Sequence, residues 1–191
     1  MMNSVKLSLL AGVVIFSLAA CNKKDSPVTV VPFQKVDSLK VSFSATSPYT
    51  FFSFKNDAVV ANSDSATTNW DFGLHFTTFI VNSFASGPGN AGAILQTSTY
   101  ESAGIAPANG YAYDTTSSKK AIKDGSWYNY NPSTHSFSPK AGQVFFFRTA
   151  DNKYVKFELL AVDYEPFTGY VPVTLIYRFR YTYQPNGSKN F

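Results

Sequence analysis

The stretch VTLIYRFRYTYQ, residues 173–184, decides the fold class because its side chains alternate in character along the chain. One set is apolar or aromatic and consists of Val173, Leu175, Tyr177, Phe179, Tyr181 and Tyr183. The set between them consists of Thr174, Ile176, Arg178, Arg180, Thr182 and Gln184. Successive side chains of a β-strand point to opposite faces of its sheet. The alternation therefore predicts a strand with one buried face and one wetter face.

Other segments have the composition of short strands separated by turns. We predict strands over residues 39–44, 49–54, 94–100, 143–149 and 154–162, and we add the apolar run 70–81, which lacks helical periodicity. Residues 150–153 contain Asp and Asn, which favour the tight turn of a hairpin. Residues 86–92 are rich in Gly and Pro and predict an irregular loop, whereas residues 116–123 suggest one or two helical turns. The sequence thus predicts an all-β fold of mainly antiparallel sheets with little helix.

Composition agrees with a single aromatic β domain. Aromatic residues make up 17% of the 191 residues and charged residues only 15%, a balance that favours strands over disorder or coiled coil. The formal net charge is +4. Lys and Arg form no dense tract, so we expect no nucleic-acid partner.

The N-terminus has the order of a bacterial export signal. Lys6 precedes an apolar stretch over residues 7–18, which is too short to span a bilayer but long enough for a signal peptide. The sequence Leu-Ala-Ala-Cys that ends at Cys21 resembles the bacterial lipobox. This resemblance implies a signal peptide over residues 1–20 and acyl chains on Cys21, which hold a protein to a membrane without spanning it.

We therefore divide the chain into three parts: the signal peptide 1–20, the lipidated Cys21 with a polar tether over 21–35, and a β domain over 36–191. Asn22 stands where inner-membrane lipoproteins often have aspartate, so we expect the outer membrane, with either face open. The alternatives are a transmembrane anchor or a secreted protein with an incidental cysteine.

Enzyme signatures are absent from the sequence. It contains no G-x-S-x-G, no phosphate-binding loop and no H-E-x-x-H, and it has only two histidines, His75 and His135. We expect a binding protein rather than an enzyme.

Three segments together resemble the HmuY family of haem-binding lipoproteins. They are the Trp-Asp segment 69–82, the segment 127–156 with its Arg-Thr-Ala-Asp hairpin, and the aromatic segment 177–184. The resemblance implies an all-β, hand-like domain over residues 36–191 that holds haem between loops at one end. It further implies that haem is passed to a TonB-dependent outer-membrane transporter, and that two histidines or methionines bind the iron.

Haem iron needs donors such as His, Met, Cys or Tyr. Met1 and Met2 lie in the predicted signal peptide and Cys21 is expected to be acylated, so His75, His135 or a tyrosine must supply any strong ligand. His75 alternates with Phe72, Leu74 and their neighbours, which predicts that it lies outside the core. His135 lies in a turn-rich loop, where binding residues are common.

Arg148, Arg178 and Arg180 are candidates to pair with the haem propionates, because guanidinium groups bind carboxylates with forked geometry. The tyrosines at 111, 113, 128 and 130 are candidates to line a slot for a flat ligand. Each of these residues has a simpler interpretation as a solvent-facing or half-buried side chain. The sequence thus predicts a haem-binding outer-membrane lipoprotein, with a non-enzymatic lipoprotein that binds a glycan, peptide or protein as the alternative.

Overall fold

The computed structural model describes residues 32–168 and 171–191 and contains eleven β-strands and one short 3-10 helix in that part of the chain. The strands are β1 (Phe33–Ser42), β2 (Thr50–Ser53), β3 (Ala58–Val60), β4 (Phe72–His75), β5 (Thr78–Val81), β6 (Gly92–Thr97), β7 (Tyr128–Asn131), β8 (Ser136–Pro139), β9 (Gln143–Arg148), β10 (Tyr154–Thr168) and β11 (Val171–Gln184). The helix is η1 (Asn62–Asp64). The predicted all-β, antiparallel fold is confirmed.

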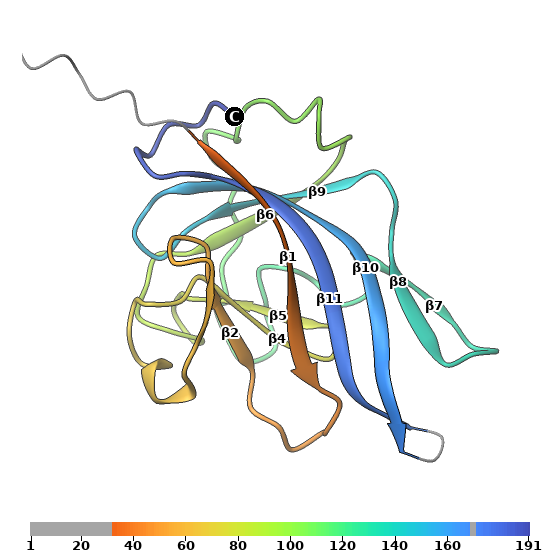
Figure 1. Ribbon diagram of the computed structural model, residues 1–191. Helices are drawn as coiled ribbons and strands as arrows, with labels where there is room; N and C mark the ends of the chain where they lie inside the picture. The colour runs from red at the N-terminus through yellow and green to blue at the C-terminus, as the bar shows by residue number, and fades with distance from the viewer. Residues whose placement is uncertain (1–31, 169–170) are drawn as a thin grey trace, which may run out of the picture.

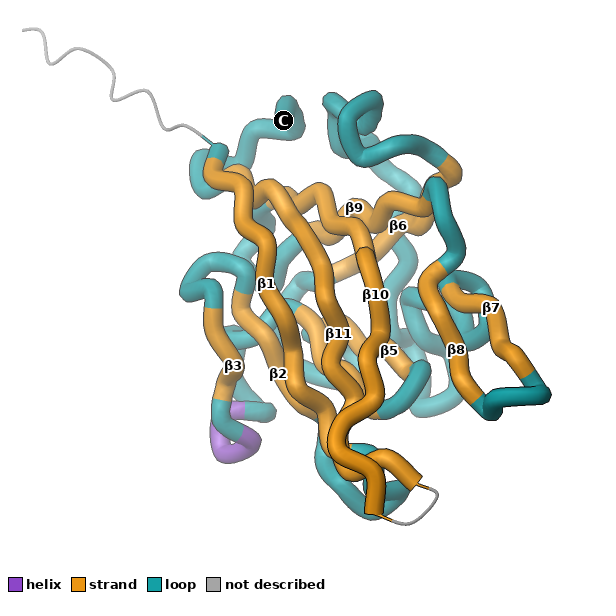
Figure 2. The backbone as a smooth tube through the Cα atoms, turned by 45° about the vertical axis from the view of Figure 1, so that its right-hand side comes forward, coloured by secondary structure: helices purple, strands orange, loops and turns teal. Residues whose placement is uncertain are grey.

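The strands form two facing sheets and a separate hairpin (Figures 1 and 2). The larger sheet has the order β1-β11-β10-β9-β6, and the smaller has the order β3-β2-β4-β5. Strands β7 and β8 pair only with each other. In Figure 1 this hairpin projects from the side of the domain, next to the C-terminal half of β10.

The core lies between the two sheets and is made largely of aromatic rings. Leu175, Tyr177, Phe179, Tyr181 and Tyr183 of β11 are buried in it, as the alternation along residues 173–184 predicts. Val173, near the start of β11, is exposed. The other face of β11 is only partly wet, since Ile176, Thr182 and Gln184 are also buried.

Two predictions for the segments around the core are wrong. The run 70–81 is not one strand but the hairpin β4–β5, whose turn places Phe76 at a φ of 48°. Trp70, at the start of the run, packs against Phe51 and Ile80 in a cluster separate from the main core, to which Phe72 belongs. Residues 116–123 form no helix; the buried side chain of Ile122 and a hydrogen bond from the amide of Ala121 to Asp114 hold this segment in an irregular path.

Buried polar side chains fix the loops to the sheets. Asp71 accepts hydrogen bonds from the backbone amides of Phe54, at 2.8 Å, and Ala150, at 2.9 Å, and so ties the smaller sheet to the β9–β10 turn. Asn82 accepts from the amide of Gly89 at 2.8 Å, which anchors the Gly- and Pro-rich loop predicted over 86–92. Such fully bonded polar groups stabilise one arrangement of the loops.

Residues 1–31 lie outside the described part, so the predicted signal peptide and the proposed lipidation at Cys21 stay predictions. Across residues 32–168 and 171–191, the structure has no helix with the length and apolar character needed to cross a membrane.

Candidate functional site

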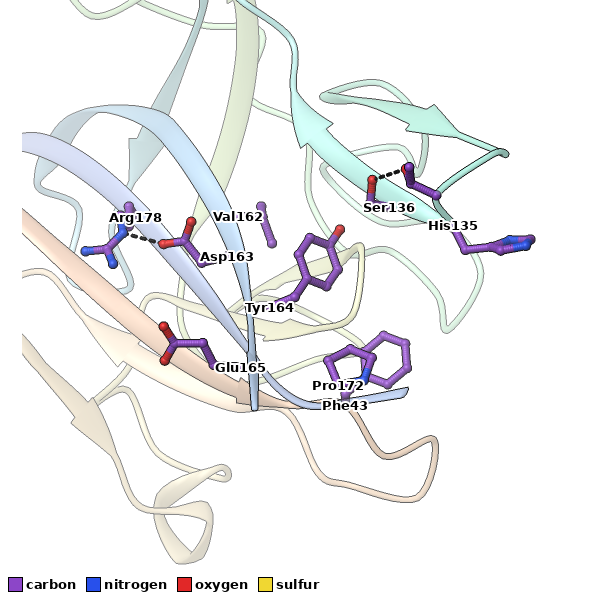
Figure 3. A pocket seen from close by; sticks show the side chains of 10 residues that line it. Phe43, His135, Ser136, Val162, Asp163, Tyr164, Glu165, Pro172 and Arg178 are labelled. Carbon is purple, nitrogen blue, oxygen red and sulfur yellow. Dashed lines mark hydrogen bonds and ion pairs between the residues drawn. The ribbon is translucent and has the colours of Figure 1, made fainter. Parts of the chain in front are cut away.

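A cavity of about 850 Å³ opens between the β7–β8 hairpin and the tip of the β10–β11 hairpin (Figure 3). Its lining combines apolar and charged groups from four parts of the chain: Phe43, Thr134, His135, Ser136, Val162, Asp163, Tyr164, Glu165, Pro172 and Arg178. Its volume is within the range of small-molecule sites in proteins. We refer to it below as the end cavity.

The path of β10 creates the end cavity. This strand pairs with β9 only over Tyr154–Phe157, and a bulge between Leu159 and Ala161 then shifts its register against β11. Bulges bend a strand and increase its twist. Within the described ranges, β10 has no ladder partner beyond the bulge on the side that faces the β7–β8 hairpin. The cavity occupies the space beside this free edge.

The inner wall of the end cavity is aromatic. The ring of Phe43, just after β1, packs edge-on against Phe76 at a centroid distance of 4.7 Å. Tyr164 packs against Phe137 of the hairpin at 5.8 Å. Both Phe43 and Tyr164 are half-buried and rest on the main core. The wall is therefore a rigid extension of the core that stays accessible to a ligand.

Tyr164 also joins the hairpin to the larger sheet. Its hydroxyl accepts a hydrogen bond from the amide of Phe137 at 2.7 Å and donates one to the carbonyl of Phe137 at 3.0 Å. Burial raises the pKa of this phenol, so it stays protonated at neutral pH and can keep both bonds. The hydroxyl of Tyr164 thus holds β8 next to β10 by two hydrogen bonds to the backbone of β8.

Replacing Tyr164 with phenylalanine should loosen the hairpin without unfolding the domain. The change removes both bonds to Phe137, and one lost hydrogen bond costs about 0.5–1.5 kcal/mol. We expect the amide of Phe137 to exchange with deuterium about tenfold faster, as a change of about 1.4 kcal/mol requires. The matched control is Tyr130→Phe, whose hydroxyl contacts the ring of His135 rather than the backbone. Equal exchange rates in Tyr164→Phe and the native chain would contradict this role.

His135 lines the end cavity from the turn of the β7–β8 hairpin. Its backbone has a φ of 51°, which is uncommon outside glycine. Its Nδ1 lies 2.9 Å from the hydroxyl of Tyr130. Figure 3 shows the imidazole pointing away from Tyr164 and Phe43, toward the outside. In this rotamer His135 stands at the rim of the cavity rather than within it.

His75 does not line the end cavity. It ends β4 on the face of Gly73, outside the main core as its parity predicts, and its Nε2 lies 3.1 Å from the carbonyl of Ser44. Its ring packs against Tyr49 at 5.6 Å and against Phe76 at 4.7 Å. The structure therefore places His135 in the lining of the end cavity and His75 outside it, so the two predicted ligands do not meet there.

The three predicted arginines are not gathered at one site, and each already has protein partners. Arg178 lines the end cavity but forms an ion pair with Asp163 at 2.5 Å. Arg180 pairs with Glu158 at 2.5 Å and with Glu101 at 2.8 Å.

Arg148 lies at the opposite end of the larger sheet, where it pairs in register with Tyr154 at the start of β10. Its guanidinium donates to Asn90 at 2.7 Å and to the hydroxyl of Tyr113 at 2.5 Å. Arg148 thus holds the Gly-rich loop in place, and Arg178 is the predicted arginine that reaches the end cavity.

Sequence reasoning missed most of the residues that form the wall. Phe43 and Val162 were assigned to strands without a site role, and Tyr164 and Pro172 lay outside the predicted strands and were not singled out. The available signal was their position, since each lies near a strand end or a hairpin tip and such positions commonly carry binding residues. Their convergence depends on the bulge in β10, which the sequence pattern does not reveal.

The end cavity fits the apolar part of a porphyrin better than its iron. The half-buried wall suits a flat aromatic ligand. Among the residues that line the cavity, His135 is the one imidazole, and the hydroxyl of Tyr164 is already bonded to Phe137. No group of three or more His, Cys, Asp or Glu side chains in the described ranges is arranged to hold a metal ion by itself.

Comparison of the whole fold with solved structures gives several matches at low sequence identity. The apo HmuY analog of Tannerella forsythia matches with a TM-score of 0.53 and 13% identity, over 80% of this chain and 97% of that chain. A Bacteroides vulgatus protein, provisionally assigned as HmuY-like and heme-binding, has a TM-score of 0.47 and 14% identity over 76% and 90%. A Bacteroides fragilis protein provisionally assigned as a lipoprotein has a TM-score of 0.47 and 14% identity over 74% and 86%.

No protein-family model matches the chain, and no curated protein sequence matches it significantly. The match to the Tannerella forsythia protein covers nearly the whole of that chain. A likeness of backbone at 13% identity shows a shared fold, whereas function depends on the residues of the site. The resemblance predicted from residues 69–82, 127–156 and 177–184 is thus confirmed as a resemblance of fold, and this chain has an HmuY-like fold.

Proposed function

We propose that this protein binds haem in the end cavity, as a non-enzymatic carrier. One observation carries the proposal: an open cavity of about 850 Å³ lies beside a rigid aromatic wall at one end of an HmuY-like fold. The rings of Phe43 and Tyr164 offer the apolar contact that a porphyrin needs. When bound, haem would supply an iron centre that the protein's own residues do not provide.

His135 is the residue best placed to bind the iron. Its hydrogen bond to Tyr130 lies at the exposed end of the hairpin, so a change of side-chain rotamer would cost little. Its backbone already stands at the cavity rim. His75 does not line the cavity, so we expect one strong protein ligand rather than two.

A hemin titration of the purified chain tests the proposal. We expect a shifted and sharpened Soret band at micromolar hemin. Partners of metal ligands change metal affinity by about 10–100-fold, so loss of the ligand itself in His135→Ala should weaken binding at least about tenfold. The matched control is His75→Ala, which should leave the affinity within about twofold because its ring lies outside the cavity.

The results separate the two possible sources of affinity. Iron-free protoporphyrin should bind both the native chain and His135→Ala equally, through the aromatic wall alone. No spectral change with hemin would overturn haem binding and leave the alternative of a glycan, peptide or protein ligand.

We further propose that Cys21 anchors the protein to the outer membrane and that the end cavity delivers haem to a TonB-dependent transporter. Strand β1 starts at Phe33, at the end of the domain away from the cavity, and Phe43 follows its other end (Figure 1). Ten residues of strand span about 33 Å. A tether before Phe33 would therefore join the domain at the end away from the cavity. Radioactive palmitate incorporation that depends on Cys21 is the expected result.

A further inference from the structure

A second cavity, of about 680 Å³, lies beside the irregular segment 115–126 and shares no lining residue with the end cavity. It is lined by Tyr49, Thr78, Ser117, Ser118, Lys119, Lys120, Ile122, Lys123 and Asp124. Three lysines and three hydroxyl-bearing Ser and Thr side chains thus meet in one hollow, with one acidic side chain. We call it the lysine cavity.

The positive charge in the lysine cavity is only partly balanced. Lys120 lies 3.9 Å from the buried carboxylate of Asp114 and donates to the hydroxyl of Ser86 at 3.1 Å. By contrast, Lys119 and Lys123 are exposed and form no ion pair with any carboxylate of the described residues. Two ammonium groups therefore remain free for a ligand.

The one acidic side chain of the cavity has protein donors on one of its two oxygens, Oδ1. Asp124 accepts from the hydroxyl of Tyr128 at 3.0 Å and from the amide of Gly125 at 3.0 Å. These bonds hold the carboxylate of Asp124 beside Gly125 and Tyr128, near the C-terminal end of the segment 115–126.

The loop that carries the lysines is fixed from beneath. Asp114 is fully buried and accepts from the amides of Ala121, at 2.7 Å, and Val81, at 3.0 Å. The side chain of Ile122, 4% exposed, is part of the main core. The hydroxyl of Thr116 accepts from the amide of Lys119 at 3.0 Å. The backbone on both sides of the lysines is thus anchored, which lowers the entropic cost of binding.

We propose that the lysine cavity binds a phosphate monoester. Lysine is a common phosphate ligand, and a doubly charged group with three free oxygens matches two unpaired ammonium groups with hydroxyl donors around them. The ester comes either from a soluble sugar or glycerol phosphate or from the headgroup of a phosphorylated lipid. The ring of Tyr49 forms one wall against which the carbon part of the ligand can pack.

The test measures binding of glycerol 1-phosphate to the full chain by calorimetry, and binding of phosphatidylcholine vesicles with and without phosphatidic acid by co-sedimentation. We expect millimolar or tighter binding of the soluble ester. The double variant Lys119→Gln, Lys123→Gln should weaken it at least about tenfold, as the loss of two charge-assisted hydrogen bonds requires. The control Lys40→Gln, Lys55→Gln removes the same net charge from exposed positions elsewhere and should leave binding within about twofold.

Each outcome decides the proposal or the source of the ester. Loss of both soluble and vesicle binding in the cavity variant supports a lipid headgroup, and loss of soluble binding with no vesicle binding supports a free ester. The proposal is overturned if the soluble ester does not bind, if both double variants weaken it equally, or if malonate binds as tightly. Hemin binding does not enter this test, so either proposal can fail alone.

Discussion

Replacing Phe72 with alanine should destabilise the protein by about 3–5 kcal/mol, the usual cost of removing a buried phenylalanine side chain. Phe72 lies on β4 of the smaller sheet and is fully buried. Its ring contacts Phe147 and Phe157 of the larger sheet, at centroid distances of 5.7 Å and 5.8 Å. Alanine would leave an empty space between the two sheets at the centre of the core.

Urea unfolding, followed by the fluorescence of the buried Trp70 and Trp127, measures this loss. Because small domains are stable by only about 5–15 kcal/mol, the variant should unfold at a much lower urea concentration. The matched control is Phe84→Ala, since Phe84 is 71% exposed. Its stability should stay within about 0.5 kcal/mol of the native chain. A similar loss in both variants would show that the sheets are not held together by this aromatic contact.

The second large effect is a dependence of stability on pH that comes from Asp71. Burial raises the pKa of this carboxyl to about 7, against the hydrogen bonds from Ala150 and Phe54, which lower it. The folded state therefore holds a proton that the unfolded state, with a pKa of 3.8, releases. The proton on Asp71 therefore stabilises the folded state. This stabilisation is complete below the pKa of the unfolded state and is lost as the pH rises through about 7.

We expect the free energy of unfolding to fall between pH 5 and pH 8. The fall is about 1.4 kcal/mol for each pH unit in which Asp71 is protonated in the folded state and ionised in the unfolded state. Thermal unfolding across this range is the measurement. Asp71→Asn should lose the dependence, because an amide does not titrate. It should also be less stable at pH 5, because Asn offers one acceptor oxygen where Asp71 bonds two amides. The control Glu165→Gln, at an exposed position, should keep the slope. A slope unchanged in Asp71→Asn would refute the assignment.

The fold was predictable where one strand carries a clear period of two. Residues 173–184 alternate along their whole length, and β11 buries the predicted face from Leu175 to Tyr183. The hairpin β9–β10 was also predictable, because Asn152 adopts the positive φ of 65° that its turn requires.

Local patterns failed where distant contacts decide the path of the chain. The segment 116–123 has a helix-like start, but Asp114 and the burial of Ile122 hold it irregular. The run 70–81 breaks into two strands at Phe76, whose carbonyl accepts a hydrogen bond from the hydroxyl of Tyr177 on β11. The core that buries Ile122 is built from strands distant in sequence, and Phe76 and Tyr177 lie 101 residues apart, so neither contact could be inferred from local composition.

The candidate site was predictable only in part for the same reason. His135 and Arg178 reach the end cavity, whereas His75, Arg148 and Arg180 do not line it. By residue type, all five were equally good candidates for haem contacts. The bulge in β10 and the position of the β7–β8 hairpin determine which of them reach the cavity. The aromatic wall that carries the proposal comes from residues whose type is common throughout this chain.

The most direct test of haem binding in the end cavity is the broadening of backbone amide NMR signals by the paramagnetic iron of hemin. Added hemin should broaden the amides of Phe43, His135 and Tyr164 first and leave those around Arg148, at the opposite end of the larger sheet, sharp. Broadening centred on Arg148, or uniform weak broadening over the whole surface, would contradict a haem site between the two hairpins.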